Sequence, residues 1–104
     1  MHTEIADKRE ALAALCRRYG VLRLELFGSA ARGQDFDPKR SDADLLVEFG
    51  AGSTDLLLFL DFKEQAEAIL GRPVDLVERE AVEASRNPIR RRRILAEAEL
   101  LYAA

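Results

Sequence analysis

The feature that most constrains the fold is a pair of alternating segments on either side of a loop. Val21–Phe27 and Asp42–Phe49 each alternate apolar with polar residues, which is typical of strands with one buried face. The segment from 28 to about 41 contains two glycines and a proline, so a loop is expected to join the strands. The residues expected on the buried face are Leu22, Leu24, Leu26, Ala43, Leu45 and Val47.

Helical periodicity precedes the first strand and follows the second. Residues from about 3 to 19 carry apolar side chains at helical spacing, and Gly20 is expected to end this helix. A second helix is expected to begin at a cap on Ser53 or Thr54 and to end at Gly71. Its predicted apolar stripe comprises Leu56, Phe59, Phe62, Ala66 and Ile69.

The remainder of the chain predicts one more strand and one more helix. The strand is expected over Arg72–Val77, and the helix from an Asn87 cap and Pro88 to about Tyr102. Residues 1–104 are therefore expected to form a single α+β domain. Its two layers would be a small mixed sheet of three to four strands and helices packed mainly on one face.

Three aspartates are expected on the opposite, open face of the sheet. Asp42 and Asp44 are two residues apart on one strand, so their Cα atoms lie roughly 6.5–7 Å apart on the same face. Asp75 joins them if its strand lies beside Asp42–Phe49. Oxygen ligands without His or Cys favour Mg²⁺, with Mn²⁺ as a substitute. The alternative is that Asp42 caps a turn and Asp44 is a solvated strand residue. Also expected on this face are Arg23, Glu25 and Glu48.

The loop after the first strand has the composition of a phosphate-binding turn. Gly28 lets backbone amides approach a phosphate, and Ser29 adds a hydroxyl donor. For Gly28 and Ser29 alone, a plain strand-to-helix turn is the alternative. Together with the carboxylate pair, they predict a metal–nucleotide site.

Over nearly its whole length the chain resembles the nucleotidyltransferase superfamily related to DNA polymerase beta, and most closely its minimal, MNT-type branch. The resemblance is carried by Gly28-Ser29-Ala30-Ala31-Arg32-Gly33, followed after eight residues by Asp42-Ala43-Asp44-Leu45-Leu46-Val47. It implies a polymerase beta-like fold and transfer of a nucleotidyl group, AMP from ATP, to a hydroxyl with the help of two Mg²⁺ ions.

The resemblance also implies a role for each acidic residue. Asp42 and Asp44 would hold the metals that bind the triphosphate, and Asp75 would complete the metal site and act as general base on the attacking hydroxyl.

The loop residues are implied to bind the nucleotide. Gly28 and Ser29 would seat the β- and γ-phosphates, and Arg32 and Gly33 belong to the same nucleotide-binding turn. For Arg32 a surface role is the alternative.

The acceptor implied by the resemblance is a tyrosine of a HEPN ribonuclease toxin, with this chain as its antitoxin. A chain of 104 residues leaves no room for an acceptor-binding domain, which fits an acceptor held by another chain. Two alternatives remain. One is an antitoxin that acts by contact alone and has a vestigial nucleotide site. The other is a small-molecule nucleotidyltransferase with a separate acceptor-binding subunit. The sequence leaves homo- or hetero-oligomerisation open.

Composition excludes several other classes. Sixteen Lys plus Arg against nineteen Asp plus Glu give a net charge of −3, which disfavours direct, sequence-specific nucleic-acid binding. One cysteine and one histidine exclude a disulfide framework and a zinc cage. No segment approaches the roughly 20 apolar residues of a bilayer span, and the cytoplasm is the expected compartment. Arg90–Arg93 is expected to be a solvated helix surface, with a docking patch for an acidic partner or RNA as the alternative.

Overall fold

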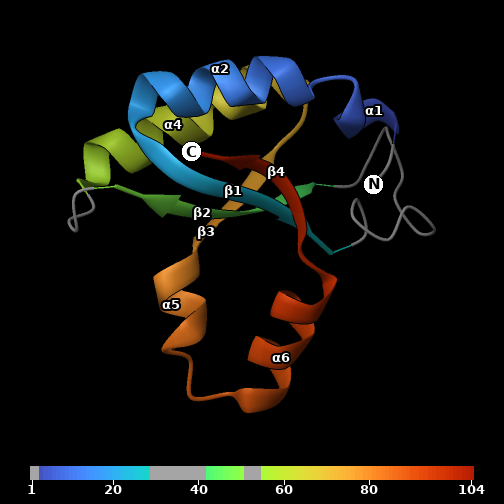
Figure 1. The fold of residues 1–104 in the computed structure, drawn as a ribbon, viewed down its shortest axis with the longest axis vertical. Coiled ribbons are helices and arrows are strands. Elements are labelled where there is room, and N and C mark those ends of the chain that lie inside the picture. The colour runs from blue at the N-terminus through green and yellow to red at the C-terminus, as the bar shows by residue number, and fades with distance from the viewer. Residues whose placement is uncertain (1–2, 29–41, 51–54) are drawn as a thin grey trace.

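The computed structural model describes residues 3–28, 42–50 and 55–104 (Figure 1). Its strands form one sheet of four in the order β3-β2-β1-β4, which confirms the predicted mixed α+β fold. None of the helices in the described ranges is long and apolar enough to cross a bilayer. In chain order the elements are α1 (Thr3–Ala6), α2 (Arg9–Tyr19), β1 (Val21–Phe27), β2 (Ala43–Phe49), α4 (Leu56–Leu70), β3 (Val74–Glu78), α5 (Arg79–Glu83), α6 (Pro88–Glu97) and β4 (Glu99–Ala103).

Strand pairing in the sheet is mixed. β1 lies antiparallel to both β2 and β4, whereas β2 and β3 are parallel. A parallel pair needs a crossover connection, and α4 provides it. Figure 1 shows α2 and α4 on one face of the sheet and α5 and α6 on the other. The crossover is what brings β3 beside β2.

The main core lies between the sheet and the α2–α4 layer. Phe62 is fully buried at its centre, and the rings of Tyr19 and Phe49 meet it edge-on at centroid distances of 5.7 and 5.8 Å. The predicted glycine stops are confirmed, since Gly20 and Gly71 both have left-handed backbone angles and end α2 and α4.

The sequence predicted that the opposite face of the sheet would be open, but the structure shows it partly covered. A second apolar cluster buries Phe27 and Leu46 of the sheet against Val82 of α5 and Ile94 of α6. Glu25, expected on an exposed face, is only 5% exposed. The expectation was wrong because α5 and α6 return beneath this face and cover part of it.

The start of β1 also departs from simple alternation. Leu22 is 46% exposed, whereas its neighbour Val21 is buried in the core. The register with β2 shifts between Val21 and Arg23. Such an irregularity inserts an extra residue and reverses the side-chain direction on one side of it. The prediction that Leu22, Leu24 and Leu26 share one face assumed unbroken alternation.

The first predicted helix is interrupted. α1 ends at Ala6 and α2 starts at Arg9, and the turn between them is tightened by the Lys8 amide, which donates to the Ile5 carbonyl at 3.0 Å. Ile5 is nevertheless fully buried, so the break changes the direction of the helix without losing its apolar contact.

The start of α4 lies later than predicted. Asp55 is the N-cap, and its carboxylate accepts a hydrogen bond from the Leu57 amide at 2.9 Å. Ser53 and Thr54 lie outside the described residues. Leu56, placed in the apolar stripe, is 67% exposed because it borders a groove of about 370 Å³, which Phe59 and Leu76 also line.

The largest correction concerns the C-terminus. The Asn87 cap and the Pro88 start are confirmed, but α6 ends at Glu97, and Glu99–Ala103 forms the edge strand β4. This segment pairs with the edge of β1 that β2 leaves unpaired. Pairing satisfies backbone groups of β1 that a helix would leave without partners.

Candidate functional site

Two of the predicted acidic residues are neighbours across the sheet. Asp44 of β2 is in register with Asp75 of the parallel strand β3, and with Phe27 on its other side. Residues in register on adjacent strands lie about 4.8 Å apart. Asp75 is exposed and Asp44 is half-buried. Both belong to the face covered further along by α5 and α6, because Leu46, two residues after Asp44, is in the second cluster.

Gly28 lies against the side chain of Asp44. Its φ is +71°, a left-handed conformation that L side chains rarely adopt. A Cβ at this position would lie 2.3 Å from Asp44 Oδ2 and 3.2 Å from Asp44 Cγ. The carboxylate of Asp44 therefore rests against the backbone of Gly28, and glycine is required there both for the turn and for this approach.

Asp42 is exposed and immediately precedes β2. The next amide, that of Ala43, donates to the Pro73 carbonyl at 3.0 Å and so joins the start of β2 to the segment before β3. Within residues 3–28, 42–50 and 55–104, no three His, Cys, Asp or Glu side chains gather closely enough to form a metal cluster. The structure thus brings Asp44 and Asp75 together and leaves Asp42 at the exposed strand start.

The remaining predicted nucleotide-binding residues lie outside the described residues. These are Ser29, Arg32 and Gly33.

A buried ion pair beside the aspartates was not anticipated. Glu25 is one row further along the same face, in register with Leu46, and its carboxylate accepts hydrogen bonds from Arg79 and, at 3.0 Å, from Arg23 Nε. Arg79 is the first residue of α5 and also pairs with Glu83 at 3.2 Å. The pair ties α5 to β1. An alternating glutamate gave no sign of burial, because its partner comes from a helix that the sequence pattern did not predict.

A second polar contact fixes the start of β3. The Glu67 carboxylate of α4 accepts a hydrogen bond from the Val74 amide at 2.9 Å. It also forms an ion pair with Lys63 at 3.4 Å. The backbone hydrogen bond, with the Lys63 charge, lowers the pKa of Glu67. Val74 is the residue before Asp75, so this contact helps to hold Asp75 in register with Asp44.

The donor chemistry of the paired aspartates fits a hard divalent cation. Two carboxylates in register repel each other, and a divalent ion between them replaces the repulsion with attraction. Oxygen donors without imidazole or thiolate suit Mg²⁺ or Mn²⁺ rather than zinc. Such an ion would also leave coordination positions for water and phosphate oxygens.

Comparison with known proteins gives a consistent assignment. The model of the nucleotidyltransferase domain family matches residues 8–101. MJ0435 of Methanocaldococcus jannaschii, named as a candidate protein adenylyltransferase, is 37% identical over 94 residues, which cover 90% of this chain and 94% of that protein. The protein adenylyltransferase MntA of Thermococcus cleftensis is 39% identical over 79 residues, 76% of this chain and 73% of that protein.

Solved structures agree with this assignment. A candidate minimal nucleotidyltransferase superposes with a TM-score of 0.72 at 39% identity, with 95% of each chain covered. A toxin–antitoxin crystal structure with AMP-PNP gives a TM-score of 0.68 at 18% identity, covering 92% of this chain and 73% of that one.

A complex of tri-AMPylated Shewanella oneidensis HEPN toxin with MNT antitoxin gives a TM-score of 0.63 at 16% identity, covering 93% of this chain and 71% of that one. At such identities the toxin–antitoxin structures show a shared fold. The domain match and the two archaeal relatives go further: this chain belongs to the nucleotidyltransferase domain family and is a nucleotidyltransferase of the minimal type.

Proposed function

We propose that this protein transfers AMP from ATP to a tyrosine hydroxyl of a partner HEPN-type toxin, and that it is the antitoxin of the pair. The observation that carries the proposal is the register of Asp44 with Asp75, with Asp44 resting against Gly28. This arrangement sets two carboxylates beside a left-handed glycine turn, and both groups suit a metal-bound triphosphate.

Asp42, Asp44 and Asp75 would hold two Mg²⁺ ions. When bound, these ions supply neutralisation of the triphosphate charge and a lowered pKa for the acceptor hydroxyl. Gly28 and Ser29 would present donors to the β- and γ-phosphates.

Arg32 and Gly33 would belong to the same nucleotide-binding turn.

The transfer step balances with one proton acceptor. The acceptor oxygen forms a bond to the α-phosphorus, the bond from that phosphorus to the bridging oxygen of the β-phosphate breaks, and pyrophosphate leaves. The hydroxyl proton would pass to the carboxylate of Asp75, which is exposed and therefore within reach of an acceptor from solution.

The protein acceptor is supported by the named relatives. A curated relative is a protein adenylyltransferase, and a structure of the same fold belongs to a complex that contains an AMPylated HEPN toxin.

The test is AMP transfer from ATP labelled at the α-phosphate to a purified HEPN-type partner in the presence of Mg²⁺. Wild-type protein should label the partner, whereas Asp44→Asn and Asp75→Asn should abolish labelling. Glu48→Gln is the matched control, because Glu48 is an exposed carboxylate on the same strand and face as Asp44. An unlabelled partner, or equal activity of Asp44→Asn and wild type, would refute the proposal.

A test in cells separates catalysis from inhibition by contact. Asp42→Asn/Asp44→Asn should fail to neutralise the toxin if AMP transfer is the antitoxin activity. Full neutralisation by this double variant would show that binding alone suffices.

A further inference from the structure

Helix α6 begins with an unusual concentration of positive charge. Arg90–Arg93 follows Pro88 and Ile89, so the first half of the helix holds four consecutive arginines, with no acidic residue in its first turn. The amino end of a helix carries a partial positive charge, and cations there are unfavourable. The helix dipole therefore does not favour arginines at this end.

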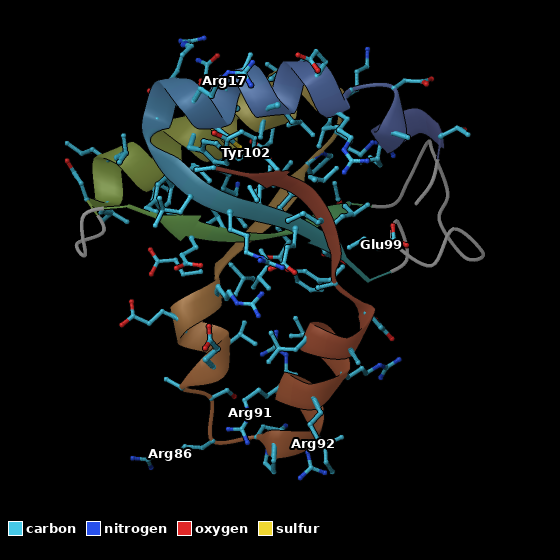
Figure 2. All side chains as sticks on the ribbon, in the orientation of Figure 1. Arg17, Arg86, Arg91, Arg92, Glu99 and Tyr102 are labelled. Carbon is cyan, nitrogen blue, oxygen red and sulfur yellow. The ribbon has the colours of Figure 1, made fainter. Side chains whose placement is uncertain are left out.

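Two of the four arginines, Arg91 and Arg93, have a partner among the described residues. Arg91 donates to the Ser85 carbonyl at 2.9 Å, and Arg93 pairs with Glu97 at 3.6 Å. Across the part of the chain that the structure describes, Arg90 and Arg92 make no ion pair, and both are exposed. Figure 2 places Arg91 and Arg92, with Arg86, at the end of the molecule farthest from α2.

An apolar side chain lies among the arginines at this end of the molecule, which we call the basic end (Arg86 and Arg90–Arg93). Ile89, in the first turn of α6, is 79% exposed. Arginine is enriched at protein interfaces, whose buried core is apolar, whereas phosphate contacts use cations and amides and need no aliphatic group. The net charge of −3 also opposes a polynucleotide.

The basic end lies on the same side of the sheet as the paired aspartates. A cavity of about 150 Å³ separates α5 from α6, and its lining runs from Val77 of β3 to Arg90 and Arg91. Val77 is two residues beyond Asp75 and so shares its face. A protein bound at the basic end would therefore approach the face that carries Asp75, whereas α2 and α4 occupy the opposite face (Figure 1).

We propose that the surface formed by Arg86, Ile89, Arg90 and Arg92 docks an acidic surface of the acceptor protein and so presents its hydroxyl to the Asp44–Asp75 face. This inference rests on the proposed function for the identity of the acceptor. It assigns the recognition of the partner to these arginines, which explains why Arg90 and Arg92 make no ion pair within the described residues.

The test compares two double variants that remove the same charge. Arg90→Ala/Arg92→Ala changes the proposed docking surface. Arg17→Ala/Arg18→Ala changes the last turn of α2 on the other side of the sheet, where cations are favourable to the helix (Figure 2). Affinity for the purified HEPN-type partner is measured by titration calorimetry without nucleotide, at low and high salt.

The proposal predicts opposite effects in the two variants. Arg90→Ala/Arg92→Ala should weaken binding about tenfold and reduce its salt dependence, while its melting temperature stays the same or rises. Arg17→Ala/Arg18→Ala should bind as wild type does and melt lower. Equal affinity of the two variants for the partner would overturn the proposal. So would a parallel titration with a short single-stranded RNA in which the wild type binds the RNA and Arg90→Ala/Arg92→Ala does not.

The two proposals can fail separately. Because binding is measured without nucleotide, a partner that binds but is never labelled would refute AMP transfer and leave the docking surface intact. A partner that is labelled equally well by Arg90→Ala/Arg92→Ala and wild type, at the same KM for the partner, would refute the docking surface alone.

Discussion

The Asp44 carboxylate touches the backbone of Gly28, at a position where a single methyl group would come within 2.3 Å of Oδ2. The contact joins the end of the first strand to the side chain expected to bind metal. The left-handed turn and the acidic strand are thus one structural unit, and a change in the turn is a change in the direction of the carboxylate.

Gly28→Ala should therefore impair catalysis much more than folding. An L residue at this φ costs roughly 1–2 kcal/mol in the free energy of unfolding. The added methyl also forces the Asp44 side chain to rotate away, and a displacement of about 1 Å in a catalytic group lowers kcat by roughly 100-fold. AMP transfer and urea denaturation of the same preparation measure the two effects.

Gly20→Ala is the matched control. Gly20 has φ +69°, and a Cβ there would meet no heavy atom within 4 Å. The control should lose similar stability but keep its activity. If both variants lose activity equally, the contact with Asp44 is unimportant.

The Glu25 ion pair should stabilise the protein mainly through Arg79. The Arg79 side chain is 26% exposed and that of Arg23 is 43% exposed, while the Glu25 side chain is 6% exposed. Removing Arg79 leaves a buried carboxylate with one weaker partner, so Arg79→Met should cost about 2–3 kcal/mol, and Arg23→Met about 1 kcal/mol or less.

Urea denaturation of the single variants and of Glu25→Gln/Arg79→Met measures these costs. The double variant should lose less stability than the sum of Glu25→Gln and Arg79→Met, since each removes the same pair. Additive losses would contradict a direct interaction.

Glu67 should make folding sensitive to acid. Its folded-state pKa is lowered, mainly by the hydrogen bond from the Val74 amide. A carboxylate of this kind contributes stability that is fully present above its unfolded pKa, about 4.3, and is lost as the pH falls through the folded value. Melting temperatures from pH 7 down to acid should therefore fall less steeply for Glu67→Gln than for wild type.

Glu64→Gln serves as the control for Glu67, because Glu64 is an exposed glutamate on the same helix. Its melting curve against pH should follow that of wild type. Parallel curves for Glu67→Gln and Glu64→Gln would show that the Val74 contact contributes nothing to the acid response.

Cys16 should be unreactive in the folded protein. Burial raises the pKa of its thiol to about 12 from 9.0, so the thiolate needed for alkylation is nearly absent at neutral pH. Iodoacetamide at pH 8 should modify the native protein more slowly than the urea-unfolded protein, by a factor on the order of 100 or more. Equal labelling rates in the two states would contradict this.

The raised pKa of the Cys16 thiol also predicts a loss of stability as the pH rises from 9.0 toward 12, and Cys16→Ala should lack this contribution.

Local patterns predicted the parts of the fold that local forces decide. The β1 and β2 segments follow from alternation, and the helix ends at Gly20 and Gly71 follow from their left-handed backbone. The adjacency of Asp44 and Asp75 was predicted only on condition that β3 lies beside β2, and the α4 crossover meets that condition.

The features that the sequence did not reveal depend on contacts between distant segments. Leu100 and Leu101 suit either a helix or a strand, and only the unpaired edge of β1 selects the strand β4. Glu25 is buried because Arg79 arrives from α5, which lies 54 residues further along the chain. Alternation within β1 carries no information about that partner.

The outermost position of β3 gives Asp75 a second consequence. An edge strand offers unpaired amides and carbonyls to any similar strand, and an exposed charge such as Asp75, the second residue of β3, discourages such pairing. Two molecules that joined at this margin would bring their Asp75 carboxylates together. Asp75, to which we assign a catalytic role, therefore also opposes edge-to-edge aggregation. Replacing it with a neutral residue should lower solubility without stabilising the fold.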